Sequence, residues 1–157
     1  MIDQIYTFFS IEMIYLWLNF GVLPFWIMLL FFPQTKICKI FVTSAFPMLV
    51  LAVVNLYLIF EISKSGFNFF ESFNLYLGLD ELLNIFSDQN YIILFWVHFL
   101  AINLFCGSWI VKDYQKIYMP KFLAFVPIVL TYFVGPLGVS LYWIFRIFFS
   151  KKIDLYD

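Results

Sequence analysis

The chain has 157 residues, of which 64% are hydrophobic and only 12% are charged. A soluble domain carries about twice that share of charge, so the sequence indicates a protein whose main solvent is lipid. The net charge of −1 provides no basic field, which excludes nucleic acid as a partner.

Four long runs of the sequence contain no Asp, Glu, Lys or Arg, and each can cross a hydrocarbon core of roughly 30 Å as a helix. They cover residues 13–35, 40–60, 89–111 and 122–145. We therefore predict an all-α integral membrane protein, a four-helix bundle that forms a single domain over residues 1–157. The spans are expected near 11–33, 39–61, 90–112 and 121–145. Their even number predicts that both termini lie on the same side of the membrane.

Proline and glycine interrupt two of these runs. Pro24 lies inside the first run, where it is expected to kink the helix. Gly135, Pro136 and Gly138 lie inside the last run, whose apolar stretch continues to about residue 149 and is too long for one upright span. We predict a helix that is kinked or broken at this motif, with its tail toward the interface. The first residues lack a basic leader, so the first span is expected to be an uncleaved anchor.

The segment between the second and third runs has apolar residues at helical spacing and polar residues on the opposite face. This pattern predicts short interfacial helices over residues 67–87, lying on the membrane surface. An amphipathic cap over the bundle would give the same pattern. The apolar residues expected to turn inward are Leu79, Leu82, Leu83 and Phe86.

The basic residues leave the sidedness of a four-span protein open. The first and third loops carry five of them, Lys36, Lys39, Lys112, Lys116 and Lys121. The other side would carry Lys64 and the three basic residues near the C-terminus. Because the two sides carry five and four basic residues, the positive-inside rule hardly favours either orientation.

Polar side chains inside the runs are costly in hydrocarbon and are therefore the candidates for function. Asn19, Asn55 and Asn103 each have two interpretations: an interhelical hydrogen bond that fixes packing, or a group that orients a ligand. Asp113 ends the third run beside Lys112 and is expected to be an interfacial charge.

His98 is the sharpest candidate, because it is the only histidine and lies within an otherwise uncharged run. Histidine can act as a general acid or base near neutral pH, although a membrane histidine often only fixes packing. We predict that His98 points into the bundle, toward a polar pocket shared with Asn19. Trp96 lies beside it in sequence, and Trp109 follows on roughly the same helical face.

Several kinds of site are excluded by these residues. One histidine cannot build a bis-histidine haem site or a three-histidine zinc site, and no nucleotide-binding motif occurs, so no metal and no cofactor are expected. The 23 Phe, 10 Tyr and 5 Trp suit a long, rigid, apolar ligand, but aromatic residues that face lipid would look the same. Cys38 and Cys106 are expected to be small buried hydrophobes rather than a disulfide.

Three stretches together resemble a known family. They are residues 19–33, with Asn19 and Leu23-Pro24; residues 96–113, with Trp96-Val-His98; and residues 135–142, with Gly135-Pro136-Leu-Gly138. Their order and spacing resemble the ABA-deficient-four-like membrane family, which includes plant neoxanthin synthase. The resemblance extends from about residue 8 to residue 149.

The resemblance implies a role in carotenoid metabolism. The plant member acts in the conversion of violaxanthin to neoxanthin, which opens an epoxide and generates an allene without a redox cofactor. Such an isomerisation needs an acid at the epoxide oxygen and a base at a nearby carbon-bound proton. The resemblance places His98 at the family's histidine and Asn103 where an aspartate is expected. Either that aspartate is structural, or Glu12 or Asp113 replaces it, or this chain does not perform the plant reaction.

The sequence is therefore compatible with three functions. The first is a membrane-embedded carotenoid or isoprenoid isomerase in which His98 transfers the proton. The second is a non-enzymatic pigment- or lipid-binding subunit of a membrane complex, and the third is a small transporter or assembly factor. The expected location is a bacterial inner membrane or a plastid membrane, with the bilayer, an isoprenoid and a membrane complex or second copy as partners. The residues expected to bind or orient the ligand are Asn19, Trp96, Asn103, Trp109 and Tyr132.

Overall fold

The computed structural model describes residues 10–64, 73 and 76–150 of the chain. In these residues there are six α-helices, one π-helical segment and no strand, which confirms the all-α prediction. The chain divides into two compact units, and each is described by itself. The first unit comprises Met1–Gly21 and Leu49–Phe99, and the second comprises Val22–Met48 and Leu100–Asp157.

Three helical stretches of the described chain are long and apolar enough to cross a membrane, which fits a membrane protein. They are α2 (Ile11–Phe31), the stretch Cys38–Lys64 and α5 (Gln89–Lys116). The middle stretch contains the π-helix η1 (Cys38–Val42) and the α-helix α3 (Phe46–Lys64). Their bounds agree with the first three spans expected from the sequence. Pro24 lies inside α2, which continues through it.

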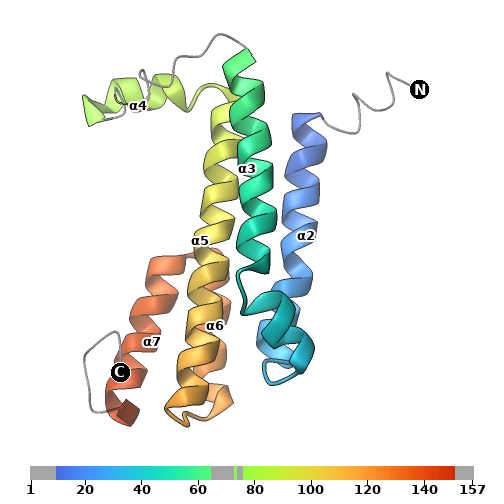
Figure 1. The fold of residues 1–157 in the computed structure, drawn as a ribbon. Coiled ribbons are helices and arrows are strands. Elements are labelled where there is room, and N and C mark those ends of the chain that lie inside the picture. The colour runs from blue at the N-terminus through green and yellow to red at the C-terminus, as the bar shows by residue number, and fades with distance from the viewer. Residues whose placement is uncertain (1–9, 65–72, 74–75, 151–157) are drawn as a thin grey trace. The chain divides into compact units, whose positions relative to one another are not determined.

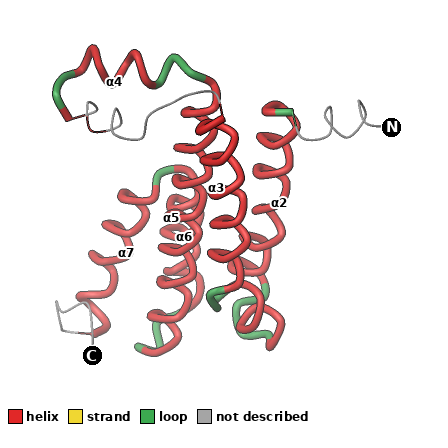
Figure 2. The backbone as a smooth tube through the Cα atoms, turned by 45° about the horizontal axis from the view of Figure 1, so that its top comes forward, coloured by secondary structure: helices red, strands yellow, loops and turns green. Residues whose placement is uncertain are grey.

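In the first unit, the short helix α4 (Leu79–Ile85) runs across the direction of α3 (Figures 1 and 2). It falls within the expected interfacial segment, of which residues 67–72, 74 and 75 lie outside the described residues. None of its residues is buried, and Leu79 and Leu83 are 69% and 59% exposed. Leu79 and Leu83 therefore do not turn inward onto the protein as expected, whereas Leu82 and Phe86 are partly buried. A helix of two turns offers too short an apolar stripe to be covered by its own unit.

In the second unit, the fourth apolar run forms two short helices rather than one span. They are α6 (Lys121–Phe133) and α7 (Gly135–Ser150), separated at Val134, where φ is −143° and ψ is 86°. The two helices lie side by side and run in opposite directions (Figure 1). The expected break at the glycine-proline motif is therefore present, and residues 121–145 do not form one continuous helix.

Glycine allows the two helices of this hairpin to approach closely. A Cβ atom on Gly138 would lie 2.6 Å from the Cα atom of Thr131, a backbone atom that cannot move aside cheaply. The Thr131 hydroxyl donates a hydrogen bond to the Pro127 carbonyl at 2.7 Å, which keeps this side chain within its own helix. The absence of a side chain at Gly138 therefore lets α7 pack directly against the backbone of α6.

Candidate functional site

A groove with a volume of about 390 Å³ opens on the first unit, between the beginnings of α2 and α5. Its walls are apolar or aromatic, and its polar side chains, Glu12 and Gln89, are both exposed. The remaining lining residues are Ile11, Tyr15, Leu16, Ile92 and Ile93. This volume lies at the lower end of the range for small-molecule sites, and an apolar cleft with few polar groups is the usual composition of such a site.

An aromatic and polar cluster adjoins this groove through Tyr15. The Tyr15 ring lies 6.1 Å from the Trp96 ring, and Trp96 stacks on Phe99 at 5.2 Å. The Trp96 indole N–H donates to Oδ1 of Asn19 at 3.3 Å, and Nδ2 of Asn19 donates to the Tyr15 carbonyl at 2.7 Å. The structure thus brings together Asn19 and Trp96, two of the residues singled out from the sequence.

His98 does not share this cluster as expected, because its side chain is exposed. The prediction that it points into the bundle beside Asn19 is wrong, and the Asn19 amide pairs with Trp96 instead. The reason is helical phase: Ile93 and Val97 are buried on α5, and successive residues of a helix are about 100° apart. His98 is therefore turned away from the face that carries these apolar side chains. Its catalytic role stays a prediction.

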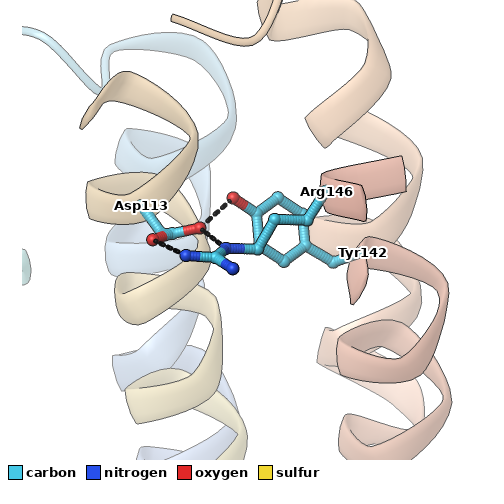
Figure 3. A network of polar contacts seen from close by, with 3 residues as sticks. All are labelled: Asp113, Tyr142 and Arg146. Atoms are coloured by element: carbon cyan, nitrogen blue, oxygen red, sulfur yellow. Dashed lines mark hydrogen bonds and ion pairs between the residues drawn. The ribbon is translucent and has the colours of Figure 1, made fainter. Parts of the chain in front are cut away.

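The second unit contains a buried charged network that joins α5 to α7 (Figure 3). Oδ2 of Asp113 accepts hydrogen bonds from the Tyr142 hydroxyl at 2.6 Å and from Nε of Arg146 at 2.7 Å. Nη2 of Arg146 also donates to Oδ1 of Asp113, at 3.5 Å. Arg146 is 1% exposed and Asp113 is 8% exposed. Asp113 is therefore not the exposed charge expected beside Lys112 but the buried partner of Arg146.

Aromatic rings cover this network. Trp109 meets the Tyr142 ring edge-on at 5.6 Å and stacks on Trp143 at 6.2 Å. The guanidinium of Arg146 lies 5.1 Å from the centre of the Trp143 ring. Trp109, expected to bind a ligand, thus packs against the network. Because these charged groups are almost wholly buried and paired with each other, their arrangement holds α7 on α5 rather than receiving a substrate.

Sequence reasoning missed Arg146 and Tyr142 as members of this network, although one signal was present. Both lie in the last apolar run, four residues apart, so they occupy one face of a helix. A charged residue within a membrane segment usually pairs with an opposite charge, and Asp113, at the end of the preceding run, is such a partner for Arg146.

Asn103 and Tyr132 also meet in the second unit, at the turn of the hairpin. Asn103 is 2% exposed, and its Nδ2 donates to the Tyr132 carbonyl at 3.4 Å. A Cβ atom on Gly135 would collide with Oδ1 of Asn103. The Tyr132 ring packs edge-on against Trp26 at 5.3 Å. These contacts are those of a packing position: the Asn103 amide supplies a donor to a backbone carbonyl that the broken helix leaves without one.

Candidate metal ligands do not gather in the part of the chain that the structure describes. No group of three or more His, Cys, Asp or Glu side chains lies close enough together there to hold a metal ion. Cys38 is buried and Cys106 partly buried, and both are free thiols. The described geometry thus offers an apolar groove, an exposed histidine and a closed charged network.

The comparisons with known proteins identify the family. No curated protein and no solved structure matches the chain. The family model described as ABA DEFICIENT 4-like matches residues 13–142, which covers most of the sequence. That range includes most of both units and the hairpin as far as Tyr142. Of the groove residues it includes all but Ile11 and Glu12. The chain belongs to the ABA DEFICIENT 4-like family.

Proposed function

We propose that this protein is embedded in a membrane and binds an oxygenated carotenoid, a xanthophyll, in the groove of the first unit. Membership of the ABA DEFICIENT 4-like family and the three long apolar helices support this proposal. The observation that carries it is the composition of the groove, which combines apolar walls with Glu12 and Gln89.

The chemistry of a xanthophyll suits this composition. Its end ring is apolar but carries a hydroxyl or epoxide oxygen, and its polyene chain is long, rigid and hydrophobic. Glu12 and Gln89 provide hydrogen-bonding groups for the ring oxygen, while Ile92 and Ile93 contact the carbon skeleton. The neighbouring rings of Tyr15 and Trp96 continue the aromatic surface along which a polyene can lie.

A variant that fills the groove tests this proposal. Ile92 lines the groove and is 44% exposed, whereas Ile102 lies on the same helix, outside the groove, and is 47% exposed. The protein is purified in mild detergent, loaded with an epoxy-xanthophyll and examined by absorption spectroscopy after removal of free pigment. Wild type and Ile102→Trp are expected to retain pigment, and Ile92→Trp is expected to lose it. Equal retention by both variants would refute the groove as the site.

The second candidate function is isomerisation of the bound epoxy-xanthophyll. The observation that favours it is that the Glu12 carboxyl and the His98 imidazole, both able to transfer protons, are exposed on the first unit. A proton from the acid goes to the epoxide oxygen, one C–O bond breaks, and the base takes a proton from a nearby carbon as the allene forms. The elemental composition of the substrate is unchanged, so neither oxidant nor reductant is needed. Chromatography of the pigment after incubation with the protein tests for product.

Retention of pigment without conversion would assign the protein to the non-enzymatic pigment-binding class. Absence of both would favour a transporter or an assembly factor.

A further inference from the structure

We propose that the α6–α7 hairpin is re-entrant: it enters the membrane and leaves it on the same face. The chain then crosses the membrane three times, and its two termini lie on opposite sides. This inference rests on the membrane insertion proposed above. It replaces the expectation, drawn from four charge-free runs, that both termini share one side.

The lengths of the two helices exclude a separate crossing by either. The 13 residues of α6 span about 20 Å and the 16 residues of α7 about 24 Å, both less than a hydrocarbon core of roughly 30 Å. Joined end to end they would exceed the core, but the structure does not join them in this way. The backbone reverses at Val134, and α7 returns along α6 (Figure 1).

Contacts with α5 fix the direction of the return. Asn103 lies at the hairpin turn, next to Gly135, whereas Asp113 pairs with Arg146. From Asn103 to Asp113 along α5 is about 15 Å, and from Gly135 to Arg146 along α7 is about 16 Å. The helix α7 therefore runs parallel to α5 and brings the chain back to the level at which α5 ends.

The other ends of the second unit lie at this same level. The Lys121 ammonium, at the start of α6, donates to the Phe31 carbonyl at 2.9 Å, at the end of α2. The Gln115 amide, near the end of α5, donates to the Pro33 carbonyl at 3.2 Å. The end of α2, the end of α5 and the start of α6 thus lie together on one face, and α7 leads back to it.

A break inside a membrane is tolerated only where its backbone polar groups find partners within the protein. Asn103 supplies one such partner, to the Tyr132 carbonyl. The Asp113–Arg146 pair, with the Tyr142 hydroxyl, clamps the far end of α7 to α5. The Asn103–Tyr132 hydrogen bond at the turn and the Asp113–Arg146 pair at the end of α7 thus provide the internal polar contacts that a re-entrant segment needs.

The distribution of charge supports the same topology independently. In a re-entrant arrangement, one face receives eight of the nine basic residues: Lys36, Lys39, Lys112, Lys116, Lys121, Arg146, Lys151 and Lys152. The other receives Lys64 alone, together with most of the acidic residues: Asp3, Glu12, Glu61, Glu71, Asp80, Glu81 and Asp88. Four crossings would give five basic residues against four. Only the re-entrant topology makes the positive-inside rule decisive, and it assigns the C-terminus to the cytoplasm.

Cysteine labelling in a bacterial inner membrane tests this topology. In a background carrying Cys38→Ala and Cys106→Ala, a single cysteine is introduced as Tyr118→Cys, between α5 and α6, or appended after Asp157. Tyr118 is 92% exposed. A membrane-impermeant maleimide is expected to label both cysteines in inverted vesicles and neither in intact spheroplasts. The matched variant Gly78→Cys, at a position with open space for a Cβ, is expected to show the reverse.

Labelling of the appended cysteine on the face opposite to the Tyr118→Cys variant would overturn the proposal. Fusions of alkaline phosphatase and of green fluorescent protein to the C-terminus repeat the test with both native cysteines in place. The fluorescent fusion is expected to be bright and the phosphatase fusion inactive, and the opposite pattern would overturn the hairpin. Release of the protein by alkaline carbonate would instead overturn membrane insertion, which the proposed function also requires.

Discussion

Asp113 and Arg146, 33 residues apart in sequence, form an ion pair with 2.7 Å between Oδ2 and Nε. Their side chains are only 9% and 1% exposed. Removing two charges from water is costly, and their mutual attraction offsets this cost only when the remaining polar atoms also have partners. The Tyr142 hydroxyl supplies one of these partners. The pair therefore acts as a clamp between α5 and α7. Removal of either charge alone would leave the other buried without its counter-ion.

Replacement of one member of the clamp is expected to destabilise the protein strongly. Arg146→Met leaves the Asp113 carboxylate buried without its counter-ion, and such a loss typically costs about 3–5 kcal/mol. Thermal unfolding in mild detergent measures the change. The double variant Asp113→Asn/Arg146→Met removes both charges and should recover part of the loss.

Lys64→Met provides the control for this experiment. Lys64 pairs with Glu61 at 2.9 Å, but its side chain is 55% exposed, so breaking this pair should leave the unfolding temperature nearly unchanged. If Arg146→Met and Lys64→Met had the same small effect, the clamp would contribute nothing.

The close approach of α6 and α7 predicts a contrast between two glycines. Gly138→Ala introduces a methyl group against the Thr131 backbone, so the helices must separate, and the unfolding temperature in detergent should fall. In Gly21→Ala, the new methyl group meets nothing within 4 Å. Alanine also favours a helix over glycine by about 0.5–1 kcal/mol, so this variant should be neutral or more stable. A similar loss in both variants would contradict the close packing.

Asn103 is expected to stabilise the hairpin turn rather than take part in proton transfer. Asn103→Leu removes the donor to the part-buried Tyr132 carbonyl, at a cost of about 0.5–1.5 kcal/mol. The control Asn84→Leu changes an exposed side chain of α4 and should not alter stability. Thermal unfolding distinguishes the two. If Asn103→Leu abolished pigment conversion while remaining as stable as the wild type, the packing role would be wrong.

The sequence was sufficient to predict the helical class and three long helices, because long charge-free runs have few other interpretations. It was not sufficient to predict the hairpin. A run that crosses the bilayer and a run that turns back halfway have the same composition, and the motif at Gly135 and Gly138 indicates only where the helix breaks. What separates the two cases is the pairing of Arg146 with Asp113, a contact between residues far apart in sequence.

The sequence was also not sufficient to predict whether a single polar side chain faces the protein interior or its surface. The cost of an imidazole that faces lipid without a hydrogen-bond partner predicted an inward His98, but the apolar side chains of Ile93 and Val97 determine which face of α5 is covered. Conversely, the position of Asp113 at the end of a run suggested an exposed charge, whereas its pairing with Arg146 buries it. Asn19 and Trp96 were both singled out, although not as partners of each other.

The exposure of His98 leads to the last prediction, which separates chemistry from packing. His98→Ala removes a side chain that is not buried, so the unfolding temperature and the yield of inserted protein should stay at the wild-type level. If the imidazole transfers the proton in epoxide opening, conversion of an epoxy-xanthophyll should nevertheless fall by about 100-fold or more, the usual contribution of a general acid or base. His98→Gln, which retains hydrogen bonding but cannot exchange a proton near neutral pH, should lose conversion equally while still retaining pigment. A fall in stability that accounts for all the lost conversion would instead show that the ring is needed for packing, and unchanged conversion would exclude His98 from the reaction.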